Sequence, residues 1–429
     1  MRKRSKQAIV ITVFILFALG MGLLLVRFLF PATSEEVERN ETPALSRNEV
    51  QVIRIEDTGS IGIAEAVPVA DAALSENTAA EESAGEAETV SEDEVPAVSE
   101  DEAVSENEAA PEEEAPEEEE PVDEDLPADT AAPIVLAVNA APTIKIGDTF
   151  DVHKYIGYAD DVDRHVEMEV SGEVNTAAEG TYPLQITLRD DAGHSTSQKM
   201  TVKVVTEFPP STGYVGKTEA FSDFINTYKT ENTSVGIDIS RWQEDVDFEK
   251  VKAAGCEFVY MRIGGLDEGE LYTDRYYEYN IAAAKAAGLK VGIYWHAEEG
   301  NARQVKASVD YLMTVLNGQE LDFPIAYDWE DFMRFENHEM NLYDLNNNLD
   351  VFVSEVEKHG YTGCLYNSKY YLDTVWTSAS KHPVWLAYYV SSLSDHSRYF
   401  MWQHGCTGRI DGVNGDVDLD VLYHDVPMQ

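Results

Sequence analysis

The chain opens with an apolar run over residues 8–30, which only Thr12 and two glycines interrupt between Ala8 and Val26. Its length is close to the roughly 20 apolar residues that a membrane-spanning helix needs. Basic residues precede it and acidic residues soon follow. The positive-inside rule therefore predicts a cytoplasmic basic tail over 1–7, a transmembrane helix over 8–30 and an extracellular remainder. A cleaved signal peptide, which would release a secreted protein, is the alternative.

Residues 31–133 show no sustained apolar periodicity. Ala, Glu, Pro, Ser and Val dominate, with imperfect repeats at residues 90–94, 98–102 and 104–108. Such a composition buries too little apolar surface to offset the entropy of ordering, and its like charges repel one another. We therefore expect a disordered, extended acidic linker over 31–133.

Residues 134–206 alternate apolar and polar positions in short runs that glycine-containing turns separate. In one run Leu184, Ile186 and Leu188 alternate with polar residues, as a half-buried antiparallel strand requires. This pattern predicts a small all-β domain. Its expected strands cover residues 142–147, 166–170, 182–190 and 198–205.

Residues 232–429 follow a hinge and a lead-in helix in 207–231, and their pattern changes to buried-type strands that alternate with helical runs. This alternation indicates parallel strands joined by right-handed crossovers. Eight strands with helices mostly in the first half predict an α/β fold, a TIM-like barrel whose last turns have few helices. The expected strands are 235–240, 258–264, 290–297, 324–330, 362–368, 383–390, 399–405 and 417–422, and the expected helices are 247–255, 274–288, 302–318 and 342–360.

The net charge of −49 argues against a nucleic-acid-binding protein, because the chain has too few cations to neutralise phosphates. Much of this charge is local, since 28 acidic residues and no Lys or Arg lie between Glu56 and Asp129. Three cysteines without a CxxC pair exclude a disulfide framework, although a single bridge stays open. Zinc-ligand spacings, a P-loop and a dinucleotide-binding glycine motif are missing, so no cofactor, metal or nucleotide is expected.

Acidic side chains at the ends of predicted strands are the candidate catalytic groups, because functional groups of parallel barrels gather at the carboxyl ends of the strands. Asp328 and Glu330 are two residues apart on one strand and therefore project to one face. Asp238 ends another strand and could face them. Crowded carboxyl groups push their pKa values apart, so that one can act as a general acid while another stays ionised. Glycosidic cleavage requires this pair of roles.

Aromatic residues such as Tyr294, Trp385 and Tyr389 accompany these acids, and such rings suit the apolar faces of sugars. For Trp385 and Tyr389, packing in the core is an equal alternative. The alternating aspartates of residues 416–420 resemble a calcium loop, but Val421 stands where glycine is needed. Strand alternation explains these aspartates more simply.

Five segments together resemble glycoside hydrolase family 25 lysozymes, over about 195 residues from Ser234 onward. The Gly-x-Asp-x-Ser-x-Trp-Gln opening and a later Asp-x-Glu after Pro make the resemblance specific. It implies an irregular barrel with eight strands and about five helices. It also implies a retaining N-acetylmuramidase that cleaves the β-1,4 bond between N-acetylmuramic acid and N-acetylglucosamine in peptidoglycan. The segments are 235–265, 280–297, 322–330, 383–389 and 415–420.

The resemblance also implies roles for single residues. It makes Glu330 the general acid and Asp328 the carboxylate that supports the N-acetyl group of the substrate or the intermediate. Asp238 and Asp418 resemble the other acids of the same site. The positions that resemble substrate-binding residues are Tyr294, Tyr366, Tyr388 and Gln403, with Trp385 as a further candidate. Two departures concern neighbouring positions: Arg241 replaces a common His, and Asp420 replaces the usual Asn.

The domain over 134–206 resembles bacterial immunoglobulin-like surface modules, through residues 180–182, residues 190–193 and a Val-rich closing strand. This resemblance implies a fold and no chemistry. A stalk is the expected role, with ligand binding as the minor alternative.

Two other functions stay open. A non-catalytic surface protein that binds peptidoglycan would retain the site without cleaving, although the intact acid set argues against it. A chitinase-type glycosidase also carries Asp-x-Glu at a strand end, but its longer acidic run needs acids where Phe323 and Ala326 stand. The expected partners are peptidoglycan glycan strands and, through the helix over 8–30, a membrane. Neither nucleic acid nor nucleotide is expected.

Overall fold

The computed structural model describes residues 126–209 and 218–428, together with five strands closer to the amino terminus. These strands are β1 (Val10–Ala18), β2 (Met21–Leu29), β3 (Glu49–Val50), β4 (Arg54–Ile55) and β5 (Ile61–Gly62). The predicted basic tail over 1–7 and nearly all of the predicted linker over 31–133 lie outside the described residues.

Within the segment predicted as a transmembrane helix, residues 8–30, the described residues 10–18 and 21–29 form strands. β1 and β2 occupy it and pair antiparallel, from Val10 opposite Leu29 to Ala18 opposite Met21. The prediction is wrong about the element because an unbroken apolar run has no periodicity that separates a strand from a helix. This run is also rich in β-branched and aromatic residues, which favour strands. Within the described part of the chain, no helix is both long and apolar enough to cross a membrane.

Residues 126–209, which we call the β module, contain the predicted all-β domain. One sheet has the strand order β7-β11-β10-β9, and β6 pairs with β8. The four predicted strands correspond to β7, β9, β10 and β11, whereas β6 and β8 were not predicted. β8 is buried along its whole length and therefore lacks the polar alternation of a half-buried strand. The elements are β6 (Ile134–Val138), β7 (Thr143–Lys145), the 3-10 helix η1 (Val152–Tyr155), β8 (Ile156–Ala159), β9 (Glu167–Ser171), β10 (Gly180–Arg189) and β11 (Ser195–Val205).

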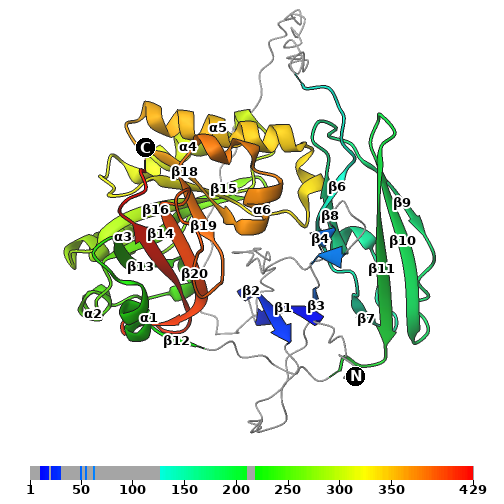
Figure 1. The fold of residues 1–429 in the computed structure, drawn as a ribbon, viewed down its shortest axis with the longest axis horizontal. Helices are drawn as coiled ribbons and strands as arrows, with labels where there is room; N and C mark the ends of the chain where they lie inside the picture. The colour runs from blue at the N-terminus through cyan, green and yellow to red at the C-terminus, as the bar shows by residue number, and fades with distance from the viewer. Residues whose placement is uncertain are drawn as a thin grey trace, which may run out of the picture. The chain divides into compact units, whose positions relative to one another are not determined.

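The carboxyl-terminal region closes into a barrel of eight strands (Figure 1). Their order is β20-β19-β18-β17-β16-β14-β13-β21, and β21 pairs back to β20. Each strand matches one of the eight predicted strands. They are β13 (Thr233–Ile239), β14 (Phe258–Asp267), β16 (Lys290–Ala297), β17 (Ile325–Trp329), β18 (Gly363–Ser368), β19 (Val384–Ala387), β20 (Met401–Arg409) and β21 (Val417–Tyr423).

β21 runs antiparallel to β13 and to β20, whereas neighbouring strands from β13 to β20 around the barrel are parallel. The connection explains this direction, because only residues 410–416 join β20 to β21 and a parallel crossover needs a dozen or more residues. The reversal places Asp418, near the start of β21, opposite Asp238, near the end of β13.

Helices accompany mainly the first half of the barrel, and α4 and α5 lie side by side outside it (Figure 1). Within residues 232–428, the eight barrel strands and the five helices α2–α6 confirm the predicted irregular barrel. The remaining elements are β12 (Glu219–Ala220), α1 (Phe221–Tyr228), η2 (Arg241–Gln243), α2 (Phe248–Ala253), β15 (Glu270–Thr273), α3 (Tyr277–Ala286), α4 (Ala302–Leu316), η3 (Phe335–His338), α5 (Leu342–Lys358), α6 (Lys369–Thr374) and η4 (Thr377–Lys381).

The β module packs directly on the barrel region. Leu136 of β6 and Ala159 of β8 belong to the same buried apolar cluster as the barrel core. Gly157 of β8 lies against the segment after β17, where an added Cβ would be 1.9 Å from the carbonyl oxygen of Phe332. The β module therefore packs more closely on the barrel region than a stalk would need to if it served only as a spacer.

Candidate active site

Asp328 and Glu330 stand at the carboxyl end of β17, where the pleat turns side chains two residues apart to the same side. Asp328 is 1% exposed and Glu330 is 7% exposed. The amide nitrogen of Asn367, on the neighbouring strand β18, donates to the carbonyl oxygen of Trp329 at 2.8 Å. This bond fixes the peptide between the two acids.

Asp238 is held by an amide side chain from β20. The Nε2 atom of Gln403 donates to Oδ2 of Asp238 at 2.8 Å. The Oε1 atom of Gln403 accepts from the hydroxyl of Tyr366 at 3.0 Å and from that of Tyr389 at 2.9 Å. Because both ends of the amide are engaged, this network fixes the position of the Asp238 carboxyl group.

The strand pairings and the Gln403 amide bring predicted acids close to Tyr366 of β18. Tyr366 stands opposite Asp328 of β17, and Gln403 joins its hydroxyl to Asp238 of β13. Asp418 of β21 stands opposite Asp238. Burial raises the pKa of the Tyr366 hydroxyl well above the usual value, and the charges of Glu330, Asp328, Asp238 and Asp418 raise it further.

Three of the other predicted substrate-binding residues differ in their surroundings. Tyr294 is buried with its ring centroid 6.3 Å from that of Trp385. Trp385 is 1% exposed, and its ring lies 4.6 Å from that of Tyr366 in a buried aromatic cluster. Trp385 thus has the core position that the sequence left open as the alternative to sugar stacking. Tyr388 is half-buried, and its carbonyl oxygen accepts from the indole nitrogen of Trp402.

Asp420 is completely buried inside the barrel, where the indole nitrogen of Trp385 donates to its Oδ1 at 3.0 Å. Burial raises the pKa of Asp420 well above its usual value, and the charges of Asp238 and Asp418 and a hydrogen bond with Asp238 raise it further. Burial beside these two acids therefore favours the protonated, uncharged form of Asp420. An asparagine at this position would likewise be uncharged, so this departure from the resemblance changes the charge of the site little.

Arg241, the other departure, lies in the turn after β13. Ser240 and Gln243 form a capping box around this turn, and the backbone N–H of Arg241 donates to Asp274 at 2.8 Å. The guanidinium carbon lies 4.9 Å from the ring centroid of Trp242. The arginine thus keeps the turn and adds a cation beside an aromatic ring near the strand end that carries Asp238.

A charged network beside Glu330 was not among the predicted site residues. Asp331 accepts from Arg334 at 3.1 Å and lies 3.0 Å from the ring nitrogen of His338, while Arg334 also pairs with Glu298 at 3.6 Å. Burial raises the pKa of Glu298 to about 7. The sequence signal for this network is the pair of acids, Glu298 and Glu299, just after the third predicted strand.

The groups that could hold a metal ion lie elsewhere. Two groups of three carboxylate or imidazole residues fall in the β module, and none is found among the described residues of the barrel. At the suspected calcium loop, Asp416 forms an ion pair with Arg409, while Asp418 and Asp420 alternate along β21. Strand alternation therefore accounts for those aspartates.

Comparison with known proteins finds a family model that matches each folded part of the chain. Residues 237–413 match the family model of Glycosyl hydrolases family 25, and residues 134–204 match that of the Bacterial surface protein, Ig-like domain. These matches coincide with the barrel and with the β module.

Two curated relatives are lysozymes. The autolytic lysozyme of Clostridium acetobutylicum is 30% identical over 187 residues, which are 43% of this chain and 54% of that protein. Lysozyme M1 of Streptomyces globisporus is 26% identical over 196 residues, which are 43% of this chain and 65% of that protein. The chain thus spans about half the length of the first relative and about two thirds of the second.

The solved structures that match part of this chain include the spore cortex lytic enzyme SleM of Clostridium perfringens. It is 21% identical, covers 46% of this chain and 69% of its own, and has a TM-score of 0.41.

Proposed function

We propose that this chain, whose residues 237–413 form a domain of Glycosyl hydrolases family 25, hydrolyses the glycan strands of peptidoglycan. One observation carries the proposal: Asp328 of β17 stands opposite Tyr366, Gln403 joins Tyr366 to Asp238 of β13, Asp418 stands opposite Asp238, and Glu330 follows at the end of β17. The lysozyme relatives, matched over the barrel, support the same class of activity.

In the proposed reaction, Glu330 protonates the oxygen of the leaving sugar as the glycosidic bond breaks. Positive charge then develops on the other sugar, and the negative charge of Asp328 stabilises it, either directly or through the N-acetyl group of the substrate. Both residues are largely buried, so little water screens this interaction. Water completes the hydrolysis, and Glu330 accepts its proton.

Asp238 and Asp418 are proposed to orient the substrate and to maintain the negative field of the site. The Gln403 amide binds Asp238 and is itself held by two tyrosine hydroxyls, so this carboxyl group has a fixed position before substrate arrives. The proposed bond is the β-1,4 linkage from N-acetylmuramic acid to N-acetylglucosamine, cleaved with retention at the anomeric carbon. This choice of bond and stereochemistry rests on the family resemblance.

The test is the release of reducing ends from purified peptidoglycan by wild-type protein and by Glu330→Gln. We expect the substitution to lower kcat by at least about 100-fold, because it removes the transferable proton and retains the side-chain shape. Glu320→Gln, at an exposed position in the loop that leads into the amino end of β17, should keep wild-type activity. Equal activity of Glu330→Gln and wild type would overturn the assignment of the general acid.

Product analysis separates this proposal from the two alternatives. Mass spectrometry of digested peptidoglycan should show fragments with N-acetylmuramic acid at the reducing end, and chitin oligomers should stay intact. Cleavage of chitin alone would favour the chitinase-type alternative. Binding of peptidoglycan without any new reducing ends would favour a non-catalytic surface protein.

We also propose that the barrel and the β module act outside the cytoplasmic membrane, with the amino terminus inside. The basic residues ahead of the apolar segment over 8–30 and the extracytoplasmic position of peptidoglycan support this placement. Protease added to intact producing cells should remove a carboxyl-terminal epitope and spare an amino-terminal one. Protection of both epitopes would contradict the placement, and sequencing of the mature amino terminus would distinguish a retained segment from a cleaved one.

A further inference from the structure

The β module carries a cluster of three carboxyl groups that the proposed hydrolysis does not use. Asp129, Asp160 and Asp161 each place one carboxylate oxygen within 4.8 Å of the other two. Three negative charges at this separation repel one another strongly unless a cation lies among them. The positively charged Arg164, three residues beyond Asp161, is engaged with Asp344 of α5.

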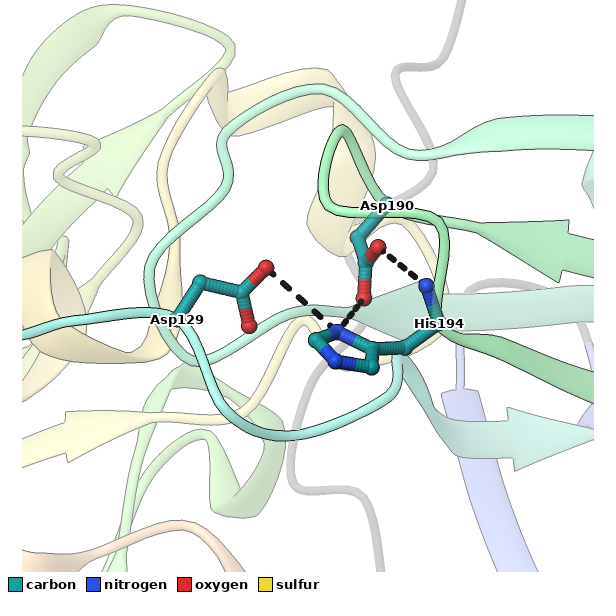
Figure 2. Close-up of side chains that lie close together, drawn as sticks. All are labelled: Asp129, Asp190 and His194. Atoms are coloured by element: carbon teal, nitrogen blue, oxygen red, sulfur yellow. Dashed lines mark hydrogen bonds and ion pairs between the residues drawn. The ribbon is translucent and has the colours of Figure 1, made fainter.

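A second group shares Asp129 but is explained without an added ion. Figure 2 shows His194 between Asp129 and Asp190, with its Nδ1 atom 3.0 Å from Asp190 and 3.6 Å from Asp129. The other oxygen of Asp190 accepts from the backbone N–H of His194 at 2.7 Å. The imidazole of His194 therefore serves as the partner of Asp129 and Asp190. Its hydrogen bond with the carboxylate of Asp190 raises the pKa of His194.

In the first cluster only Asp129 has this imidazole beside it, and no ion pair of Asp160 or Asp161 is found among the described residues. Asp160 is 1% exposed; its Oδ1 accepts from the N–H groups of Val162 and Asp163, both at 3.0 Å, whereas its Oδ2 is buried without a hydrogen bond. Oδ1 of Asp161 is also buried without a hydrogen bond. A buried carboxylate oxygen without a donor is costly, and buried polar groups normally have a partner. These two atoms belong to two of the three clustered carboxyl groups.

We propose that Asp129, Asp160 and Asp161 bind a divalent cation, and that calcium is the ion they select. All three side chains offer carboxylate oxygen, the ligand type of hard cations, and the group contains no thiol or imidazole that would favour zinc or copper. Calcium accepts irregular sets of six to eight oxygens that include backbone carbonyls and water, whereas magnesium demands an octahedron. Two positive charges would offset most of the three negative ones.

The position of the site gives the ion a structural role. The backbone carbonyls of Asp160 and Asp161 accept from the N–H groups of Leu342 and Tyr343, in the first turn of α5, at 2.9 and 3.2 Å. The same short segment thus supplies two proposed ligands and two contacts to the barrel region. A bound cation would relieve repulsion within this segment and stabilise the packing of the β module on α5.

The test compares calcium binding and thermal unfolding of the full chain after removal of metal ions. Isothermal titration with calcium chloride should show a stoichiometric site in addition to weak, diffuse binding by the acidic segment over 31–133. Calcium at about 100 times its Kd should raise Tm by about 3–6 °C. Magnesium at the same concentration should raise Tm less.

Two substitutions locate the site. Asp160→Asn retains an Oδ1 acceptor for the N–H groups of Val162 and Asp163 but removes the charge, and Asp161→Asn removes the second ligand. Each should weaken calcium binding at least tenfold and abolish most of the Tm shift. Glu173→Gln removes one exposed charge from the same module and should leave both measurements unchanged.

The outcomes decide the proposal. If wild type shows no stoichiometric site and no Tm shift with calcium up to 10 mM, about ten times the weakest Kd of extracellular modules, the proposal is wrong. It is also wrong if both Asn variants retain the wild-type shift, because the ion would then bind elsewhere. Should Asp160→Asn fail to fold, Asp161→Asn alone decides between these results, since its side chain is only half-buried.

Discussion

Asp420 is completely buried beside two other acids, Asp238 and Asp418, and burial first and their charges second raise its pKa well above the usual value. Because these effects favour the uncharged form, Asp420→Asn should change the charge of the site little. We expect kcat/KM on peptidoglycan to stay within about threefold of wild type, since no charge of the active state is removed. Steady-state release of reducing ends provides the measurement.

The matched control for Asp420→Asn is Asp238→Asn, which makes the same chemical change at the residue that Asp420 contacts. This variant removes a charge from the site and should lower kcat/KM by about 100-fold or more. Equal losses in both variants would show that Asp420 acts as a carboxylate and would contradict the neutral state.

Glu298 gives a prediction about pH. Burial, together with the charges of Asp331 and Asp267, raises its pKa to about 7 from the ordinary value of 4.5, against the opposing effects of the Glu268 N–H and Arg334. Between pH 4.5 and 7 the folded protein therefore binds a proton that the unfolded chain has released. This contribution to the free energy of unfolding is present at low pH and is lost as the pH rises toward 7.

The variant Glu298→Gln has no such loss. Urea denaturation measures the free energy of unfolding of the variant and of wild type at each pH. The value for the variant minus the value for wild type should rise from pH 4.5 to pH 7 and stay level above pH 7. The exposed substitution Glu320→Gln should follow the wild-type curve at every pH. Parallel curves for Glu298→Gln and wild type would contradict the raised pKa of Glu298.

Single residues also show how far sequence reasoning reaches. Asp328, Glu330 and Asp238 could be identified because acids at strand ends converge in any parallel barrel. The neutral state of Asp420 could not, since it depends on burial beside two other acids. The network of Asp331, Arg334 and Glu298 likewise depends on how two loops fold toward each other, and the acids after the third predicted strand do not by themselves indicate this contact.

At the scale of elements, β8 makes the tightest contact between the β module and the segment after β17. A Cβ atom on Gly157 would lie 1.9 Å from the Phe332 carbonyl oxygen, so Gly157→Ala must displace backbone. We expect a loss of roughly 1–3 kcal/mol in the free energy of unfolding, typical of an overpacked site. Because Glu330 is two residues before Phe332, activity should fall as well.

Gly405→Ala is the control for this substitution, because its added Cβ would meet no atom within 4 Å. Its free energy of unfolding should differ from wild type by no more than about 0.5 kcal/mol. Thermal and urea unfolding of both variants provide the comparison. Equal stability of Gly157→Ala and wild type would mean that β8 and the Phe332 segment are not in contact in solution.

Elements with a clear period were predictable, and those without one were not. The eight barrel strands and the long helices α4 and α5 follow from apolar runs and 3.6-residue spacing. The paired strands β1 and β2 were mistaken for a helix because their run has no alternation. The antiparallel direction of β21 follows from the shortness of residues 410–416, a signal that was present in the sequence but outweighed by the βα pattern.

At the scale of the molecule, the β module and the barrel share a buried surface that the sequence did not indicate. Composition separates the two parts, and each matches a family model of its own. Their contact depends on Leu136, Ala159 and the first turn of α5, which carry no motif. A contact between two folds joined by a hinge is a matter of surface complementarity, and no local periodicity encodes it.

An ion pair offers a direct measure of this contact. Arg164 of the β module makes two hydrogen bonds to Asp344 of α5, at 2.7 and 3.0 Å. Asp344 also accepts from the N–H of Asn341 in a capping box, so Asp344→Ala removes a cap together with the pair. A double-mutant cycle with Arg164→Ala separates these two effects. The loss of the cap contributes equally to the cost of Asp344→Ala with and without Arg164, so it cancels when the two costs are subtracted.

We expect a coupling free energy of about 0.5–1 kcal/mol from urea unfolding, since the pair is bidentate but the arginine is partly exposed to solvent. The coupling should shrink in 1 M salt, where the Debye length falls to about 3 Å. A cycle between Arg164→Ala and Asp350→Ala, an acid farther along α5 that pairs with Lys381, should give zero coupling. If the coupling free energy between Arg164 and Asp344 were also zero at low salt, the β module would behave as an independent tether. A measurable coupling requires the β module and the barrel to be in contact in the folded protein.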